Sequence, residues 1–173
     1  MNIPHLLSDK SIKASQKREQ ISNSIENNNI TIEEIKKFTT DDKGIGTILE
    51  AMEALSQKNP EIADIEWLNY ACANILSKSN TVKREASRVA GNIAHLFPDS
   101  IAETIRNLLK NTKDESTVVR WGSAYALGRI ILISQYANSV LFDKLVDLAE
   151  NEIENGVKNQ YLSGLKKAKK LLK

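Results

Sequence analysis

The side chains with chemistry of their own are few and scattered along this sequence. Cys72 is the single cysteine, and the two histidines, His5 and His95, lie too far apart to act as ligands on one helix. Cys72 has no cysteine or histidine at zinc-like spacing. Because it falls on an apolar helical face, we expect a buried, inert thiol. The sequence therefore predicts neither a metal nor a cofactor.

No motif of a familiar enzyme class occurs either. The nucleophile elbow, the P-loop and the dinucleotide fingerprint are missing, and "GIG" at 44–46 is too short to count. The acidic pairs Glu33–Glu34 and Asp41–Asp42 stand at predicted helix starts, where capping and the helix dipole explain them. These observations favour a protein that is not an enzyme.

The composition is that of an ordinary globular protein. Of 173 residues, 41% are apolar and 27% charged, enough for one domain with a sizeable core. The net charge of +2 does not demand a nucleic acid or an anionic membrane as partner. We see no signal peptide and no apolar run long enough to cross a membrane. The lone cysteine suits a reducing compartment, so we expect a cytoplasmic protein with no membrane partner.

Hydrophobic periodicity predicts an all-α fold of about eight to nine helices. Apolar residues recur at helical spacing, and no segment alternates as a half-buried strand would. Asn59–Pro60 and Pro98 break the pattern, and Thr31 with Glu34 has the spacing of a capping box. The stripe of residues 9–27 is thin, so this helix is expected to be loosely held.

Two of these helices carry the same pattern. "TVKREASRVAGNI" and "VVRWGSAYALGRI" share a valine, a basic residue, small residues, a glycine and an isoleucine. The basic residues, Lys83 and Arg120, are 37 positions apart, and a weaker copy places Lys158 another 38 positions on. One further helix separates successive copies, so each unit is a helical hairpin.

The stretch "DESTVVRWGSAYALG", residues 114–128, resembles the first helix of a HEAT repeat. The matching positions are Asp114, Val119, Arg120, Ala124, Ala126, Leu127 and Gly128. The Lys83 copy has Ser77 in place of the aspartate, and the Lys158 copy is degenerate. The resemblance covers roughly 41–173 and implies a right-handed α-α superhelix, that is, a HEAT-like α-solenoid of the armadillo type.

The expected organisation is a single domain with a helical cap at 1–40 and a repeat region at 41–173. The units span about 41–78, 79–113 and 114–152, with a partial unit at 153–173. In such a stack an inner helix packs on several neighbours. This explains why Trp121, Tyr125 and Leu132 lie opposite Val119 and Ile130 on one helix, since another layer is expected to cover them.

The resemblance also implies where partners bind, namely on a concave row made of the second helix of each hairpin. The residues expected there are Trp67, Tyr70, Asn74, Glu103, Arg106, Asn107, Lys110, Asp143, Asp147 and Glu150. Trp67 and Tyr70 would be the anchors. Two alternatives stay open: these rings pack under the amino-terminal helices, and the charged residues form a plain solvated face.

Structural roles are expected for the repeat positions. The resemblance implies that Lys83 and Arg120 hold adjacent repeats together, with Asp114 as the candidate partner of one of them. In the tail, Lys166, Lys167, Lys169, Lys170 and Lys173 oppose an apolar stripe of Tyr161, Leu165, Ala168 and Leu172. These lysines could neutralise phosphates, but a solvated face beside the negative helix end explains them equally well.

The sequence thus predicts a non-catalytic scaffold or adaptor that binds a protein or peptide. The alternative is a nucleic-acid-binding protein, including an enzyme similar to the alkylpurine DNA glycosylases built on HEAT-like repeats. In that case Trp67, Tyr70 and Asp64 would face the damaged nucleotide. The bilin lyases share the repeat type but offer no further matching motif.

Overall fold

The structure is a computed structural model that describes residues 2–38 and 41–171 of the chain. These residues form eleven α-helices and two short 3-10 helices, and they contain no strand. The all-α class is therefore confirmed. One layer consists of α2 (Ala14–Glu26), α4 (Asp42–Lys58), α6 (Asn80–Ile93), α8 (Thr117–Ile130) and α11 (Asn155–Leu171). The other contains α3 (Ile32–Lys36), α5 (Ile65–Asn74), α7 (Ala102–Asn111) and α10 (Val140–Asn151).

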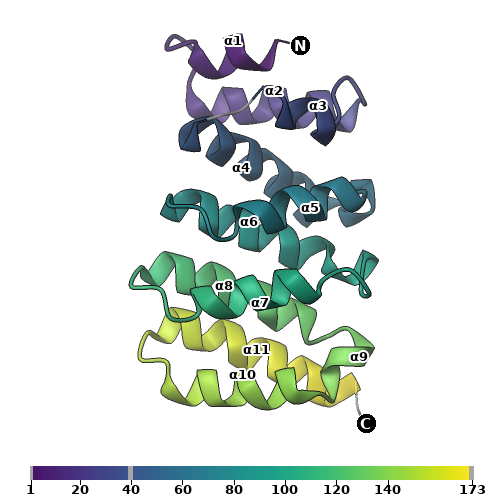
Figure 1. Ribbon diagram of the computed structural model, residues 1–173, viewed down its shortest axis with the longest axis vertical. Coiled ribbons are helices and arrows are strands. Elements are labelled where there is room, and N and C mark those ends of the chain that lie inside the picture. Colours follow the sequence, from purple (N-terminus) through teal and green to yellow (C-terminus); the bar gives the residue numbers. More distant parts are fainter. Residues whose placement is uncertain (1, 39–40, 172–173) are drawn as a thin grey trace.

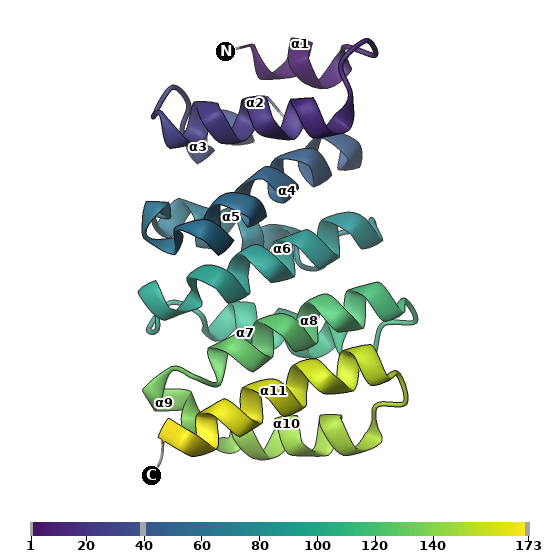
Figure 2. The same ribbon diagram turned by 180° about the vertical axis from the view of Figure 1, so that it is seen from behind.

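Successive pairs of helices follow one another in chain order along the long axis of the molecule, and the two ends of the chain lie at opposite ends of it (Figure 1). Figure 2 shows α2, α4, α6, α8 and α11 as a continuous row seen from behind. Within this row, contacts join α2 to α4, α4 to α6, α6 to α8 and α8 to α11. Each long helix therefore packs mainly against the helices before and after it in this row, and less against the helix that is adjacent in the sequence.

Two short helices were not expected from the sequence, α1 (Ile3–Ser8) and α9 (Ser134–Ala137). Both are too short to display a hydrophobic period, which explains why the expected eight to nine helices are fewer than the eleven described. The 3-10 helices Pro60–Ile62 and Ala94–Leu96 occupy the ends of segments that the sequence predicted as helical. Whether 1–40 forms a separate cap stays a prediction.

Local capping fixes several of the helix starts. The predicted capping box is confirmed: the Glu34 N–H donates to Thr31 Oγ1 over 3.2 Å, and the Thr31 N–H donates to Glu34 Oε2 over 2.8 Å. Asp41 caps α4 through the Gly44 N–H at 2.7 Å. No helix of the described residues has the length and apolar character needed to cross a bilayer.

Glycines let the helices of the α4–α6–α8–α11 row approach each other closely. A Cβ added at Gly91 of α6 would lie 2.6 Å from the Cα of Ala126 in α8. One added at Gly128 of α8 would lie 2.8 Å from the carbonyl oxygen of Gln160 in α11, where the backbone of Gly164 is also close. The same backbone contact therefore recurs at both interfaces of α8. Because α8 contacts α6, α7 and α11, apolar residues on several of its sides are buried, as the sequence implied.

Ion pairs repeat with the same period. Lys83 of α6 reaches Asp114, in the turn before α8, with 2.6 Å between Nζ and Oδ2. Arg120 of α8 reaches Glu152, in the turn before α11, with 3.0 Å between Nε and Oε2. Asp114 is thus the partner of Lys83, while Arg120 donates to its backbone carbonyl at 3.0 Å. We call these two ion pairs the rungs; each joins a helix to the turn that opens the next unit.

The rungs keep both carboxylates ionised. Burial raises the pKa of Asp114, but the Lys83 ammonium, the Ser116 N–H and the Arg120 charge outweigh it, and the net pKa is lowered. For Glu152 burial also opposes ionisation, and the Arg120 guanidinium lowers the pKa below the ordinary value. A lowered folded-state pKa means that each carboxylate stabilises the fold above its unfolded-state pKa and loses this effect as the pH falls through the folded value.

The glycine contacts predict unequal effects of adding one methyl group. Gly91→Ala places a Cβ against the Ala126 backbone, which cannot move aside as a flexible side chain could. We expect a loss of about 1–3 kcal/mol in the free energy of unfolding, measured by urea denaturation. Gly156→Ala is the matched control because its Cβ would meet only Trp121, at 4.0 Å. Equal stability of the two variants would contradict the close approach.

The rungs predict a pH-dependent contribution to stability. Asp114→Asn keeps an oxygen for the Ser116 N–H but removes the charge that Lys83 faces. We expect it to lower the free energy of unfolding by about 1 kcal/mol at pH 7. Well below pH 4 the wild-type carboxyl is itself protonated, and the difference should vanish. Asp147→Asn, at an exposed position of α10, is the control; a deficit that persisted unchanged at low pH would argue against the ion pair.

Candidate functional site

The two aromatic anchors predicted from the sequence are buried. Trp67 is 3% exposed and Tyr70 is 5% exposed. Both lie on α5, which contacts α3, α6 and α7. The prediction that they form a surface hot spot is therefore wrong, since the short helix α3 and its neighbours enclose this part of α5. Their burial agrees with the alternative, in which they pack under the amino-terminal helices, and α3 of that segment contacts α5.

The remaining residues of the predicted row differ in exposure and in hydrogen bonding. Asn74 uses its amide to donate to the Tyr70 carbonyl at 2.8 Å, and the largely buried Asn107 donates to Cys72 Sγ at 3.8 Å. The exposed members are Glu103, Arg106 and Lys110 on α7 and Asp143, Asp147 and Glu150 on α10. The structure thus leaves two charged stripes, without the aromatic end that was expected of a groove.

Asp64 does not stand free for catalysis beside Trp67 and Tyr70. Its carboxylate caps α5 by accepting the Glu66 N–H at 2.9 Å and the Trp67 N–H at 3.3 Å. With the two rings buried, the arrangement imagined for a flipped nucleotide is absent at this position. Cys72 is only partly buried, and its sulfur accepts the amide of Asn107.

A different aromatic pair is accessible, on α8 in the other layer. Trp121 and Tyr125 are one helical turn apart and stack with ring centroids 5.5 Å apart and an interplanar angle of 25°. Both are partly exposed. The Arg129 guanidinium lies 4.5 Å from the centre of the Tyr125 ring, and that of Arg88 lies 5.8 Å from the centres of both rings. Arginine side chains, and not a further layer of helices, flank these rings.

Arg88 is held in place by two acidic side chains. It reaches Glu53 of α4, with 2.6 Å between Nη2 and Oε1, and Glu85 of α6, with 2.9 Å between Nη1 and Oε2. Glu85 is 1% exposed and also accepts the Arg84 Nε–H at 2.6 Å. A buried carboxylate that accepts two charge-assisted hydrogen bonds keeps its partners in one orientation. We call Trp121, Tyr125, Arg88, Arg129, Glu53 and Glu85 the aromatic–arginine site.

A second set of hydrogen bonds fixes the Tyr125 ring. Its hydroxyl donates to Asn92 Oδ1 at 2.7 Å, and the Asn92 amide donates in turn to Ser56 Oγ of α4 at 3.0 Å. Asn92 is 4% exposed and Ser56 is 1% exposed. The Tyr125 ring is therefore anchored through α6 to α4, which holds it in one orientation.

Positive and negative side chains are nearly equal in number around the site. Burial raises the pKa of Glu53 above its ordinary value and neighbouring Glu85 adds to this, while Arg88 opposes it. An open hollow of about 420 Å³ lies between α2, α4 and α6, and Glu53, Glu85 and Arg88 line it. Four arginines and four glutamates occupy this region: Arg18, Arg84, Arg88, Arg129, Glu19, Glu50, Glu53 and Glu85. The surface therefore has little net charge.

The repeat period contained a signal for this site. Arg84 and Arg88 precede Trp121 and Tyr125 by the same 37 residues that separate Lys83 from Arg120. Equivalent positions of adjacent helices therefore carry the arginines and the rings, which places them side by side. The apolar character of the rings suggested burial instead, and so this surface was missed.

Comparison with protein-family models, with curated protein sequences and with solved structures finds no match. In residues 2–38 and 41–171, no three His, Cys, Asp or Glu side chains gather where they could hold a metal ion.

Truncation of the two tryptophans should destabilise the fold to different extents. Trp67→Ala removes a buried ring from the core, and we expect it to lower the free energy of unfolding by about 3–5 kcal/mol. Trp121→Ala removes a partly exposed ring and should cost about 1 kcal/mol, roughly one stacked aromatic contact. Chemical denaturation of both variants tests this difference, and a larger loss for Trp121→Ala would overturn the assignment of Trp67 to the core.

Proposed function

We propose that the chain is a short HEAT-like α-solenoid that binds a protein or peptide partner and has no catalytic activity of its own. The shared pattern around Lys83 and Arg120, the rungs and the glycine contacts at both interfaces of α8 support the repeat interpretation. A cytoplasmic location, suggested by the lone cysteine, belongs to the same proposal.

The binding surface is proposed on the row α4, α6, α8 and α11. In that row the backbones approach most closely, and α5 contacts α7 much less than α6 contacts α8. A stack whose layers differ in spacing curves toward the more closely spaced layer, so this row is expected to form the inner face. The row of second helices expected from the sequence to bind partners, α5, α7 and α10, would then be the outer face.

The observation that carries the proposal is the aromatic–arginine site. Trp, Tyr and Arg are the residue types that dominate the energetic centres of protein interfaces. Here they are stacked, partly exposed and fixed by buried carboxylates and by Asn92. Little side-chain entropy is lost when a partner lays an apolar or planar group on rings that are already held in place.

A nucleic-acid partner is the second candidate, because bases stack on aromatic rings and arginines contact phosphates. The charge of the surface argues against it. Arg18 pairs with Glu50 at 3.3 Å, Arg84 with Glu85 and Arg88 with Glu53, so these arginines are already neutralised. A path for a phosphate backbone needs an excess of positive charge.

The test is affinity capture from lysate of the source cells, with and without nuclease, using wild type and Trp121→Ala/Tyr125→Ala. We expect a protein that is retained after nuclease treatment and lost with the double variant. With that protein purified, the double variant should bind about 30-fold more weakly, corresponding to about 2 kcal/mol.

Phe38→Ala is the matched control, because Phe38 is an aromatic residue 47% exposed at a distant position after α3. It should leave capture and affinity unchanged. Circular dichroism of all variants checks that they are folded. Recovery that disappears with nuclease would replace the protein-binding proposal with the nucleic-acid candidate, and salt-dependent DNA binding would then be measured.

A further inference from the structure

The α10–α11 end of the molecule carries an open apolar groove. It has a volume of about 770 Å³ and lies between Val146 and Ala149 of α10 and Leu162 and Leu165 of α11. Leu162 is 47% exposed. We call this surface the end groove. It is separate from the aromatic–arginine site, which lies on α4, α6 and α8.

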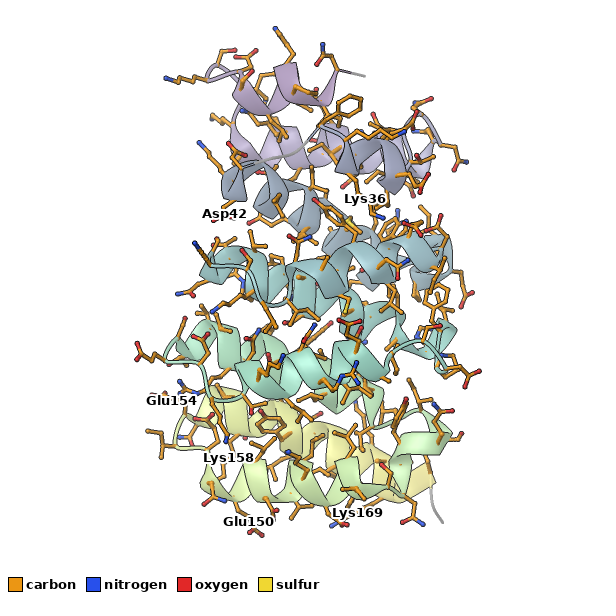
Figure 3. The ribbon with its side chains drawn as sticks, in the orientation of Figure 1. Lys36, Asp42, Glu150, Glu154, Lys158 and Lys169 are labelled. Carbon is orange, nitrogen blue, oxygen red and sulfur yellow. The ribbon has the colours of Figure 1, made fainter. Side chains whose placement is uncertain are left out.

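Lysines surround this groove. Lys158, Lys166, Lys169 and Lys170 line it, against the single carboxylate of Glu150. Figure 3 shows Lys169 and Glu150 at the end of the molecule that α10 and α11 form. The Lys169 ammonium also lies 5.9 Å from the centre of the Phe142 ring. The apolar floor therefore has a strongly basic rim, a pattern that selects for acidic groups beside apolar ones.

Lys158 occupies the position that supplies the cation of each rung. It follows Arg120 by 38 residues, as Arg120 follows Lys83 by 37. Lys83 pairs with Asp114 and Arg120 pairs with Glu152, and in each case the carboxylate comes from the turn that opens the next helical unit. Within the residues that the structure describes, Lys158 makes no such ion pair and lies instead along the end groove.

One repeat before the first rung, both the cation and the carboxylate are absent, which supports the interpretation that the two occur together. Gly46 stands 37 residues before Lys83, and Ser77 stands 37 residues before Asp114. Where the carboxylate is missing, the cation is missing as well. A cation at Lys158 is therefore expected to accompany a carboxylate that an added helix would bring.

We propose that the end groove docks an amphipathic helix of a partner protein, with an apolar stripe on Val146, Leu162 and Leu165 and acidic residues facing the lysines. One carboxylate of this helix pairs with Lys158 and forms a third rung. The docked helix extends the stack as α10 and α11 extend it beyond α7 and α8. Apolar burial provides the affinity, and the charges fix the orientation.

The probe is a synthetic, stapled helical peptide of about 18 residues, with leucines at i, i+3, i+4 and i+7 and glutamates on either side. Its binding to the full chain is measured by fluorescence anisotropy. Two control peptides are used, one with every glutamate replaced by lysine and one with the same composition and a scrambled stripe. We expect the acidic amphipathic peptide to bind at least about tenfold more tightly than either control.

Variants of the chain locate the binding. Leu162→Asp should weaken binding about tenfold or more, whereas Val118→Asp, at a position with a similar exposure of 46% on α8, should not. Lys158→Glu should weaken binding several-fold, and a peptide with one glutamate changed to lysine at the facing position should recover it. Lys113→Glu, at an exposed lysine outside the groove, is its control.

Four results would overturn the proposal. The scrambled peptide binding as tightly as the amphipathic one would show plain charge attraction. Unchanged binding to Leu162→Asp would place the peptide elsewhere. Wild-type dimers in sedimentation that Leu162→Asp converts to monomers would make a second copy of the chain the occupant. Binding to vesicles of anionic phospholipid, without preference for the acidic peptide, would make a lipid surface the occupant.

Discussion

The arrangement of the molecule depends on backbone contact between α6, α8 and α11. At Gly91 and Gly128 the helices come so close that a single Cβ would meet the backbone of the neighbouring helix. This closeness brings equivalent positions of successive helices next to one another. The rungs, the stacked rings and the arginines beside them all rely on that register. A helix that is apolar on several sides is the natural central member of such a row, because α6, α7 and α11 all pack on it.

The ion pairs align neighbouring helices more than they stabilise the fold. Lys83 and Arg120 each reach over a helix end to the turn that starts the next unit, which determines how far one helix can slide along another. On the aromatic–arginine site, Glu85 is almost completely buried and keeps Arg84 and Arg88 in place. A buried ion pair is costly to desolvate, and its best-supported role is to select one arrangement among several. The orientation of Trp121 and Tyr125 follows from that selection.

Local patterns could be read from the sequence, and contacts between segments could not. The all-α class and the capping box at Thr31 rest on spacing within single helices. The pairing of Asp114 with a repeat cation was implied by the resemblance to a HEAT repeat, and the structure gives Lys83 as that cation. Glu152 was missed as the partner of Arg120, because the copy around Lys158 is degenerate and gave no motif to align.

The exposure of the aromatic side chains could not be predicted from a single helix either. A helical wheel of α5 places Trp67 and Tyr70 away from the core, but it contains no information on the five-residue helix α3 that packs against α5. For Trp121 and Tyr125 the wheel suggested burial, whereas arginines from α6 and α8 flank them. In both cases the exposure of a ring is decided by elements whose position only the folded structure provides.

The sequence separation of the contacts between helices affects how the chain folds and unfolds. The side-chain hydrogen bonds between the larger helices join residues from 29 positions apart, Ser22 to Ala51, to 39 positions apart, Asn92 to Glu53. No such bond ties one end of the stack to the other within the described residues. Loops of this size close quickly, so folding is expected to be fast for the chain length. Stability is then expected to decrease from the centre outward, so that amide hydrogens of α6 and α8 exchange after those of α1 and α10 at the two ends.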